Sequence, residues 1–430
     1  MPSLPKAHKT SHSVSATARI ADDRPMTTRE LLRRQGFRPL AVTYGLSEIV
    51  DWLTTIALAV LVYDATHSAL ATTVLFVSSK FIPAFGAPAL TARVDGISPR
   101  RTLPVLYTAQ GLAFLGMALL STSVAAVVVL AAVAGGAALV SRALVRAAVA
   151  AVLPDPDELR KGNALLNVVF STAFAVGPAA AGAAVAAGSS QVTLVGGAAL
   201  LFAMALYAGL SRLPALTVSE AEAGDGWWTK LRRAIDHVRG EQWLARLFGA
   251  QAVLLVLFTM IPPIEVVYAR HELGTTAAGM GLLMASWGIG AVGGSAIFAR
   301  ASKLGMIPIA LASTAAMGAS YLGMGLAGTL PLACVLSMLG GIGNGMQWIG
   351  FVTAVQERTP GELQARAMAL VESMGAAVPG IGFTLGGLVA AASTARFAYM
   401  LSGTAILVVV GVAVLAARGI ARVAPQPVAA

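Results

Sequence analysis

The sequence has a single cysteine, Cys334, and few charged residues. One cysteine excludes an internal disulfide and any zinc site built on several cysteines. Only 12% of the residues are charged, about half the share found in soluble chains. A chain of 430 residues with so little charge is not expected to cover itself with a water-exposed surface.

Several kinds of chemistry also lack their usual residues. There is no Walker A pattern, no Cys/His zinc spacing and no Ser/His/Asp constellation. None of the five histidines falls in the middle of an apolar span, so a histidine proton relay is not expected. We therefore predict that the protein is not an enzyme, holds no metal or cofactor, and draws its energy from a proton gradient rather than from ATP.

Long apolar runs dominate what is present. Hydrophobic residues make up 57% of the chain and the mean hydropathy is +0.77. About 20 apolar residues span a bilayer, and backbone groups in lipid must bond within their own segment, so each run predicts a membrane helix. We number twelve predicted spans, at roughly 39–63, 68–92, 102–121, 124–150, 163–187, 191–211, 244–268, 276–299, 305–328, 331–355, 367–391 and 397–417.

The positions of lysine and arginine predict the orientation of these spans. Nearly all the lysines and arginines that lie in loops fall on one side of the membrane, and only Arg270 and Arg396 lie on the other side. Both termini are then cytoplasmic, in the inner membrane of a bacterium whose Ala, Gly and Arg content fits a GC-rich genome. The net charge of +10 thus indicates membrane orientation and not a nucleic-acid partner.

The same pattern divides the chain into five parts. Residues 1–36 form a cytoplasmic tail ending in a short surface helix at roughly 27–36, and 37–211 form a first six-helix half. Residues 212–243 form a cytoplasmic loop in which Trp227, Leu231, Ile235 and Val238 mark an amphipathic helix. A second half follows at 244–418, and a cytoplasmic tail at 419–430. PDELRKGNAL (156–165) and PGELQARAMAL (360–370) occupy corresponding places in the halves, which predicts a parallel repeat.

Three stretches carry a resemblance to a known family: TARVDGISPRR (91–101), AVLPDPDELRKGNALLN (151–167) and AVGPAAAG (175–182). Over residues 37–418 the chain resembles the major facilitator superfamily, and within it the twelve-span drug and siderophore exporter branch. The resemblance implies an all-α membrane fold of two six-helix halves that alternate access to a central cavity. It also implies a cytoplasmic gate at Asp95, Arg100 and Arg101, and an antiporter-like packing motif at Gly177, Pro178 and Gly182.

Two carboxylates, Glu48 and Asp51, stand three residues apart inside span 1. Each costs at least ~2.5–3.5 kcal/mol at this depth, so both should face a cavity or partners rather than lipid. One interpretation is that they carry the coupling proton, contact a cationic substrate, or do each in turn. The alternative for Asp51 is a permanent ion pair with Lys80, which lies in the middle of span 2. Glu48 has no such obvious partner, and we expect it to be the group that exchanges the proton.

Other polar residues within spans are candidate site residues. Arg142 and Arg146 share one face of span 4. Three interpretations are open: they bind an anionic substrate, they pair with acids of span 1 or with Glu372 of span 11, or they extend to the lipid headgroups. Glu265, near the outer end of span 7, is either a substrate-gate acid or an interfacial residue. Span 10 offers possible cavity residues at Asn344, Gln347 and Trp348, although a lipid-facing position fits Trp348 equally well.

These observations predict a secondary active transporter, a proton-coupled exporter or antiporter of the multidrug-efflux kind. Its partners would be a lipophilic or cationic small-molecule substrate, protons and the lipid bilayer, and we expect a monomer. Two alternatives remain open: an exporter of an anionic secreted metabolite such as a siderophore, and a non-transporting membrane receptor or scaffold on the same fold. The direction in which Arg142 and Arg146 face distinguishes the anion exporter.

Overall fold

A computed structural model describes residues 28–83, 98–213, 236, 240, 242–301, 306–359 and 361–423. Over these residues, eleven helices are long and apolar enough to cross a membrane. The apolar helix at Ala69–Phe81 is shorter and occupies the place of span 2. The predicted all-α membrane fold is confirmed.

A short helix, α1 (Thr28–Arg33), precedes the spans, close to where a surface helix was predicted. The helices of the first half are α2 (Phe37–Thr66), α3 (Ala69–Phe76) continued by η1 (Val77–Phe81), α5 (Pro99–Leu119), α6 (Val124–Val152), α7 (Pro156–Ala187) and α8 (Ser190–Leu210). Those of the second half are α10 (Gln242–Thr259) continued by η3 (Pro262–Ile264), α11 (Glu265–Val267) and η4 (Tyr268–Glu272), then α12 (Ala277–Ala301), α13 (Met306–Leu326), α14 (Leu330–Arg358), α15 (Gly361–Ala392) and α16 (Ala395–Val423).

The fourth and fifth spans of the two halves have matching lengths. Helices α6 and α14 each contain 29 residues, and α7 and α15 each contain 32. Both α7 and α15 carry a proline in their interior, Pro178 and Pro379. These matches fall on the segments where the sequence repeat was found.

Side-chain caps allow very short turns at the outer ends of the first half, "outer" meaning the side predicted to face away from the cytoplasm. The hydroxyls of Ser68, Ser123 and Ser189 accept hydrogen bonds from backbone N–H groups in the first turns of α3, α6 and α8. Such caps satisfy donors that a helix start otherwise leaves unpaired.

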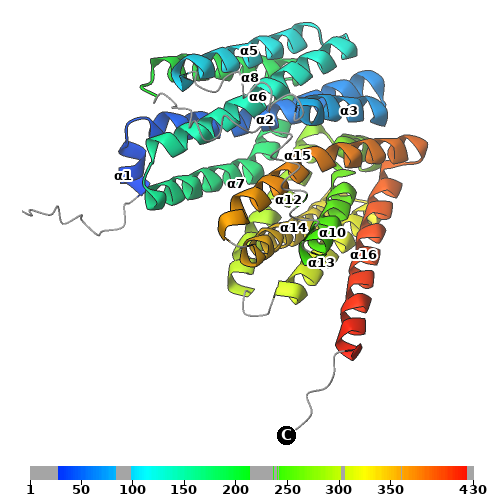
Figure 1. Cartoon of the computed structure of the whole chain (residues 1–430). Helices are drawn as coiled ribbons and strands as arrows, with labels where there is room; N and C mark the ends of the chain where they lie inside the picture. Colours follow the sequence, from blue (N-terminus) through cyan, green and yellow to red (C-terminus); the bar gives the residue numbers. More distant parts are fainter. Residues whose placement is uncertain are drawn as a thin grey trace, which may run out of the picture.

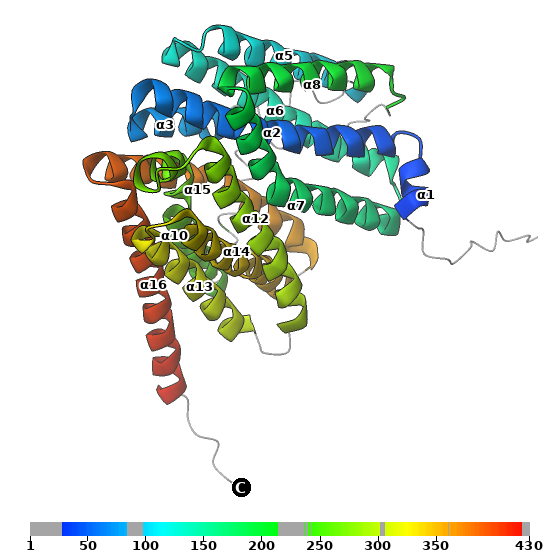
Figure 2. The same ribbon diagram turned by 180° about the vertical axis from the view of Figure 1, so that it is seen from behind.

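The two halves meet at their outer ends and diverge at their inner ends (Figure 1). Figure 2 shows the same divergence from behind, with α1 and the end of α16 far apart. At the outer side, Nη2 of Arg270 in η4 lies 3.0 Å from Oδ2 of Asp64 in α2, an ion pair that joins the halves. The structure therefore has the central space open toward the predicted cytoplasmic side.

Small residues bring the halves together at this closed side. A Cβ on Gly281 of α12 would overlap the carbonyl oxygen of Pro178 in α7, and one on Gly182 would overlap the carbonyl oxygen of Ala277. On the other flank, Gly387 of α15 lies against Thr73. Backbones can approach this closely only where side chains are absent.

Two spans depart from regular α-helix. Span 2 passes into π-helix at Val77–Phe81, and span 7 breaks at a 3₁₀ turn, Pro262–Ile264. Proline removes a backbone donor and clashes with the preceding turn, which explains the second break. π-Segments occur mostly at functional sites, and this one contains Lys80.

Some sequence expectations differ from the structure or lie outside it. Helix α16 ends at Val423, so it continues into the segment predicted as a C-terminal tail. The residues that marked an amphipathic helix between the halves, Trp227 to Val238, lie outside the described residues.

We predict that Gly281→Ala opens the outer side and closes the inner side, because the added methyl group overlaps the Pro178 carbonyl. Overpacking of this kind costs ~1–3 kcal/mol, enough to shift a two-state equilibrium. The measurement is the distance between spin labels at positions 163 and 300, near the inner ends of α7 and α12, in a Cys334→Ala background.

The matched control is Gly293→Ala in the same helix, where a Cβ meets no atom within 4 Å. We expect a shorter label distance only in Gly281→Ala. Identical distance distributions in the two variants would show that this contact does not set the conformation.

Candidate functional site

The central polar site is built on the middle of α2. Glu48 and Asp51 lie less than one turn apart there, in a helix whose other described interior residues are almost all uncharged. The Glu48 side chain is 6% exposed, whereas that of Asp51 is 29% exposed. The two acids thus differ in surroundings: one is enclosed between helices and the other opens onto a cavity.

Lys80 of the π-segment pairs with Asp51. Its Nζ donates hydrogen bonds to Oδ1 at 2.7 Å and to Oδ2 at 2.8 Å. The predicted pairing of the two midspan charges is therefore present in the structure. It joins span 1 to span 2 and neutralises both groups.

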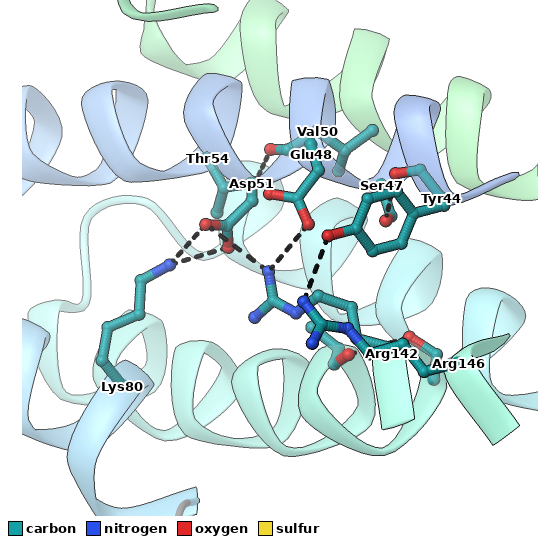
Figure 3. Close-up of polar contacts among 11 residues, drawn as sticks. Tyr44, Ser47, Glu48, Val50, Asp51, Thr54, Lys80, Arg142 and Arg146 are labelled. Carbon is teal, nitrogen blue, oxygen red and sulfur yellow. Dashed lines mark hydrogen bonds and ion pairs between the residues drawn. The ribbon is translucent and has the colours of Figure 1, made fainter. Parts of the chain in front are cut away.

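Arg142 of α6 lies beside both acids (Figure 3). Its Nη1 is 3.9 Å from Oε1 of Glu48 and 3.8 Å from Oδ2 of Asp51. The expectation that Glu48 lacks a partner was wrong, because span 4 packs close enough to span 1 for Arg142 to reach it. One turn further along, Nη2 of Arg146 donates a hydrogen bond to the Tyr44 hydroxyl at 3.4 Å. We call Glu48, Asp51, Lys80 and Arg142 the charge cluster.

Two cavities adjoin this cluster. The smaller, of about 50 Å³, is lined by Asp51, Lys80 and Arg142 among others, and has room for water. The larger, of about 540 Å³, lies between the halves, which is a size typical of small-molecule sites. Asp51 and Lys80 line both, so their ion pair stands between the two spaces.

The walls of the large cavity are mostly apolar and aromatic. In the second half they include the rings of Phe258, Trp287, Tyr321 and Tyr399. The only charged residues in its described lining are Asp51, Lys80 and Glu265. Since Asp51 and Lys80 cancel, this lining carries one net negative charge when Glu265 is ionised.

Only one of the three predicted cavity residues of span 10 lines this space. Asn344 does so, whereas Gln347 is buried and hydrogen-bonds to Gln251 of α10. Trp348 is 37% exposed and packs on Phe351 with ring centroids 5.9 Å apart. The interpretation of Gln347 and Trp348 as cavity residues is therefore wrong in this conformation, because Gln347 bonds to Gln251 and Trp348 packs on Phe351, about one turn nearer the inner end of α14 than Asn344.

The predicted cytoplasmic gate is described only in part. Asp95 lies outside the described residues. Nε of Arg100 donates a hydrogen bond to the Gly209 carbonyl oxygen of the same half at 3.3 Å, and Arg101 is exposed. Glu372 belongs to α15, but its side chain lies outside the described part of the chain. The roles predicted for these residues stay predictions.

The Gly-Pro motif of α7 contacts two different neighbours. A Cβ on Gly177 would overlap the ring of Trp52 in the same half, whereas Gly182 and Pro178 face α12 of the other half. Trp52 in turn lines the large cavity. The motif therefore joins a cavity wall to the interface between the halves.

Sequence reasoning left open whether Glu265 belongs to the site, and the structure places it in the cavity wall. It follows directly after the 3₁₀ turn at Pro262–Ile264 that interrupts span 7. A proline pair followed closely by an acid within an apolar run is the signal that points to such a position.

Removing the lysine of the Asp51–Lys80 pair should leave a partly buried carboxylate whose remaining cation, Arg142, lies 3.8 Å away. We predict that Lys80→Met lowers the free energy of unfolding by ~1–3 kcal/mol, between the values for exposed and buried pairs. Adding Asp51→Asn should restore part of that loss. Reversible unfolding in mixed detergent micelles measures both.

Arg34→Met is the matched control, because it removes a more exposed cation, Arg34 of the Arg34–Glu158 pair, whose side chain is 50% exposed against 33% for Lys80, and we expect it to change stability by less than ~1 kcal/mol. Full stability of Lys80→Met would show that the pair does not hold the two helices together.

Comparison with solved structures finds the same fold at low sequence identity. A nucleoside transporter, NupG, is 16% identical, with a TM-score of 0.69 over 87% of this chain and 97% of that chain. A POT family transporter in complex with 5-aminolevulinic acid is 12% identical, with a TM-score of 0.67 over 90% and 99%. A bacterial homolog of the human lysosomal transporter Spinster, in an inward-facing conformation, is 11% identical, with a TM-score of 0.67 over 91% and 98%.

No curated protein matches the chain. The family model of the Major Facilitator Superfamily matches residues 40–270 and 247–429, which together cover most of the sequence. The match does not distinguish a branch, so the drug and siderophore exporter branch stays a prediction. The twelve-span fold, the cavity between two halves and this match agree: the chain is a transporter, not an enzyme, and it belongs to the Major Facilitator Superfamily.

Proposed function

We propose that this protein is a proton-coupled exporter of a lipophilic, positively charged small molecule. The observation that carries the proposal is the apolar cavity of about 540 Å³ with ionisable groups in its wall. Apolar walls suit a lipophilic substrate. The net negative charge that the described lining carries when Glu265 is ionised favours a cation over an anion.

Glu48 is the group that exchanges the proton in this proposal. Its contact with Arg142 is long, at 3.9 Å, whereas Asp51 has two short hydrogen bonds from Lys80. Protonation of Glu48 still leaves Arg142 within 3.8 Å of Asp51. No cation in the cluster is left without a carboxylate, which keeps the cost of proton uptake low.

Charge balance then couples the proton to the substrate. With both acids ionised, the charge cluster has no net charge; with Glu48 protonated, it carries one positive charge. A cation in the adjoining cavity is repelled by the protonated form and tolerated by the other. Proton and substrate therefore compete, and by linkage each lowers the affinity for the other.

Alternating access would deliver the substrate outward. The cavity is open toward the predicted cytoplasmic side, and Arg270–Asp64 joins the halves on the other side. Rocking of one half against the other would break that pair and open the outer side. We place the protein as a monomer in the cytoplasmic membrane of a bacterium, with both termini inside, as the loop charges predict.

Export of an anion is less well supported. Lys80 and Arg142, the cations nearest the cavity, both lie beside carboxylates. Arg146 is turned to Tyr44 and does not line the large cavity. An anion would have to displace Asp51 from Lys80 before it gained a cationic partner.

We predict that Glu48→Gln abolishes substrate accumulation driven by a pH gradient but retains the exchange of substrate for substrate. In proteoliposomes, wild type should move tetraphenylphosphonium against a proton gradient, and Glu48→Gln should lose at least tenfold of that activity. Counterflow of labelled for unlabelled tetraphenylphosphonium, without a gradient, should continue but need a higher substrate concentration, because the neutral Gln keeps the charge cluster in its positively charged form.

Glu357→Gln, a change at an exposed acid near the inner end of α14, serves as the control and should behave as wild type. Proton-driven transport by Glu48→Gln at the wild-type rate would contradict the role given to Glu48. Absence of any tetraphenylphosphonium movement by wild type would contradict cation export.

A further inference from the structure

Glu265 is a buried acid without a partner in the described structure. The residue is 9% exposed and lines the large cavity at its closed, outer end. Within the described residues its side chain makes no hydrogen bond and no ion pair, unlike the acids of the charge cluster. A carboxylate enclosed in this way is costly unless it takes up a proton or another group compensates its charge, and a positively charged ligand in the cavity would supply that compensation.

Aromatic rings surround the same part of the cavity. The ring centroids of Phe258 and Trp287 lie 5.5 Å apart, those of Trp287 and Tyr321 lie 5.4 Å apart, and Tyr321 and Tyr399 meet edge-on at 5.5 Å. All four rings line the cavity. We call Phe258, Trp287, Tyr321 and Tyr399 the aromatic cluster.

A second polar group in this cluster also lacks a partner. The hydroxyl of Tyr399 is buried and makes no hydrogen bond among the described residues, whereas the Tyr321 hydroxyl donates to the Phe258 carbonyl oxygen at 3.3 Å. Tyr399 is fully buried in protein yet borders the cavity. The Glu265 side chain therefore adjoins this apolar space with no partner for its charge, beside an enclosed hydroxyl that also lacks one, which points to a ligand with a polar or charged end.

We propose that Glu265 and the aromatic cluster bind the positively charged nitrogen or phosphorus centre of an organic cation. Faces of Trp, Tyr and Phe attract such cations, and the attraction grows when water is excluded. Glu265 supplies the opposite charge, and the remaining cavity volume takes the lipophilic part. This inference rests on the proposed function, which it deepens by naming the subsite and the class of substrate.

Two other ligands fit this site less well. A hard metal ion needs several oxygen ligands, and the described residues contain no group of three His, Cys, Asp or Glu side chains that could hold one. An anion would face Glu265 without a free cation, because Lys80 is held by Asp51. The rings and the single acid together select an organic cation.

The test is equilibrium binding to the purified full chain in nanodiscs, without any gradient. The probes are tetraphenylphosphonium and the uncharged triphenylphosphine oxide. Wild type should bind the cation at least tenfold more tightly than the neutral probe. Glu265→Gln should lose at least tenfold in cation affinity, change little toward the neutral probe, and unfold at no lower temperature than wild type.

Glu265→Asp keeps the charge and should retain most of the cation affinity, and Glu357→Gln is the matched surface control. Trp287→Leu removes an aromatic face while leaving the acid, and should also weaken cation binding; it carries the same test if Glu265→Gln does not fold. Cation affinity of Glu265→Gln or Trp287→Leu within twofold of wild type overturns the subsite while cation export stands. Failure of wild type to bind tetraphenylphosphonium overturns cation export itself.

Discussion

The structure depends on the balance of charge in the middle of the membrane. Each ion placed at that depth needs an opposite charge, since lipid provides neither water nor hydrogen bonds. The charge cluster meets this need with two acids and two bases drawn from α2, η1 and α6. Because these contacts join three spans, the same groups that can exchange a proton also fix how the first half packs.

The two halves contribute different groups to the site. The first half holds the charge cluster, whose net charge changes by one on proton uptake. The second half presents an aromatic wall with one acid, Glu265, at the closed end of the cavity. Both face one space, so proton occupancy in one half can change the energy of a cation held by the other. A ligand shifts the conformational equilibrium only through such differences in affinity.

Several features were predictable from sequence because they follow from depth and periodicity. The position of Asp51 and Lys80 in the middle of consecutive spans predicted their pairing. The four-residue spacing of Arg142 and Arg146 predicted a shared face. The twelve apolar runs predicted the helices, although the π-segment of span 2 and the broken span 7 were not foreseen, since hydropathy reports burial in lipid and not hydrogen-bond register.

Other features required the fold. Contact between Arg142 and Glu48 depends on how α6 packs on α2, which single-span patterns do not specify. Trp348 and Asn344 are four residues apart on one face of α14, yet only Asn344 lines the cavity, since Trp348 packs on Phe351 and spacing alone does not give the depth at which a cavity ends. Glu265 was ambiguous because its distance from the outer end suits both an interfacial and a cavity position, and only the packing of span 7 in the fold shows that it lines the cavity.

The most direct test of the account is whether the purified protein exchanges a proton for a cation. Tetraphenylphosphonium would be added to wild-type protein in weakly buffered nanodiscs while proton release is followed. We predict release of about half a proton per cation bound at the pH at which half the sites are protonated, rising toward one proton at lower pH, as reciprocal linkage requires. Saturable cation binding with no proton release at any pH between 5 and 9 would contradict it.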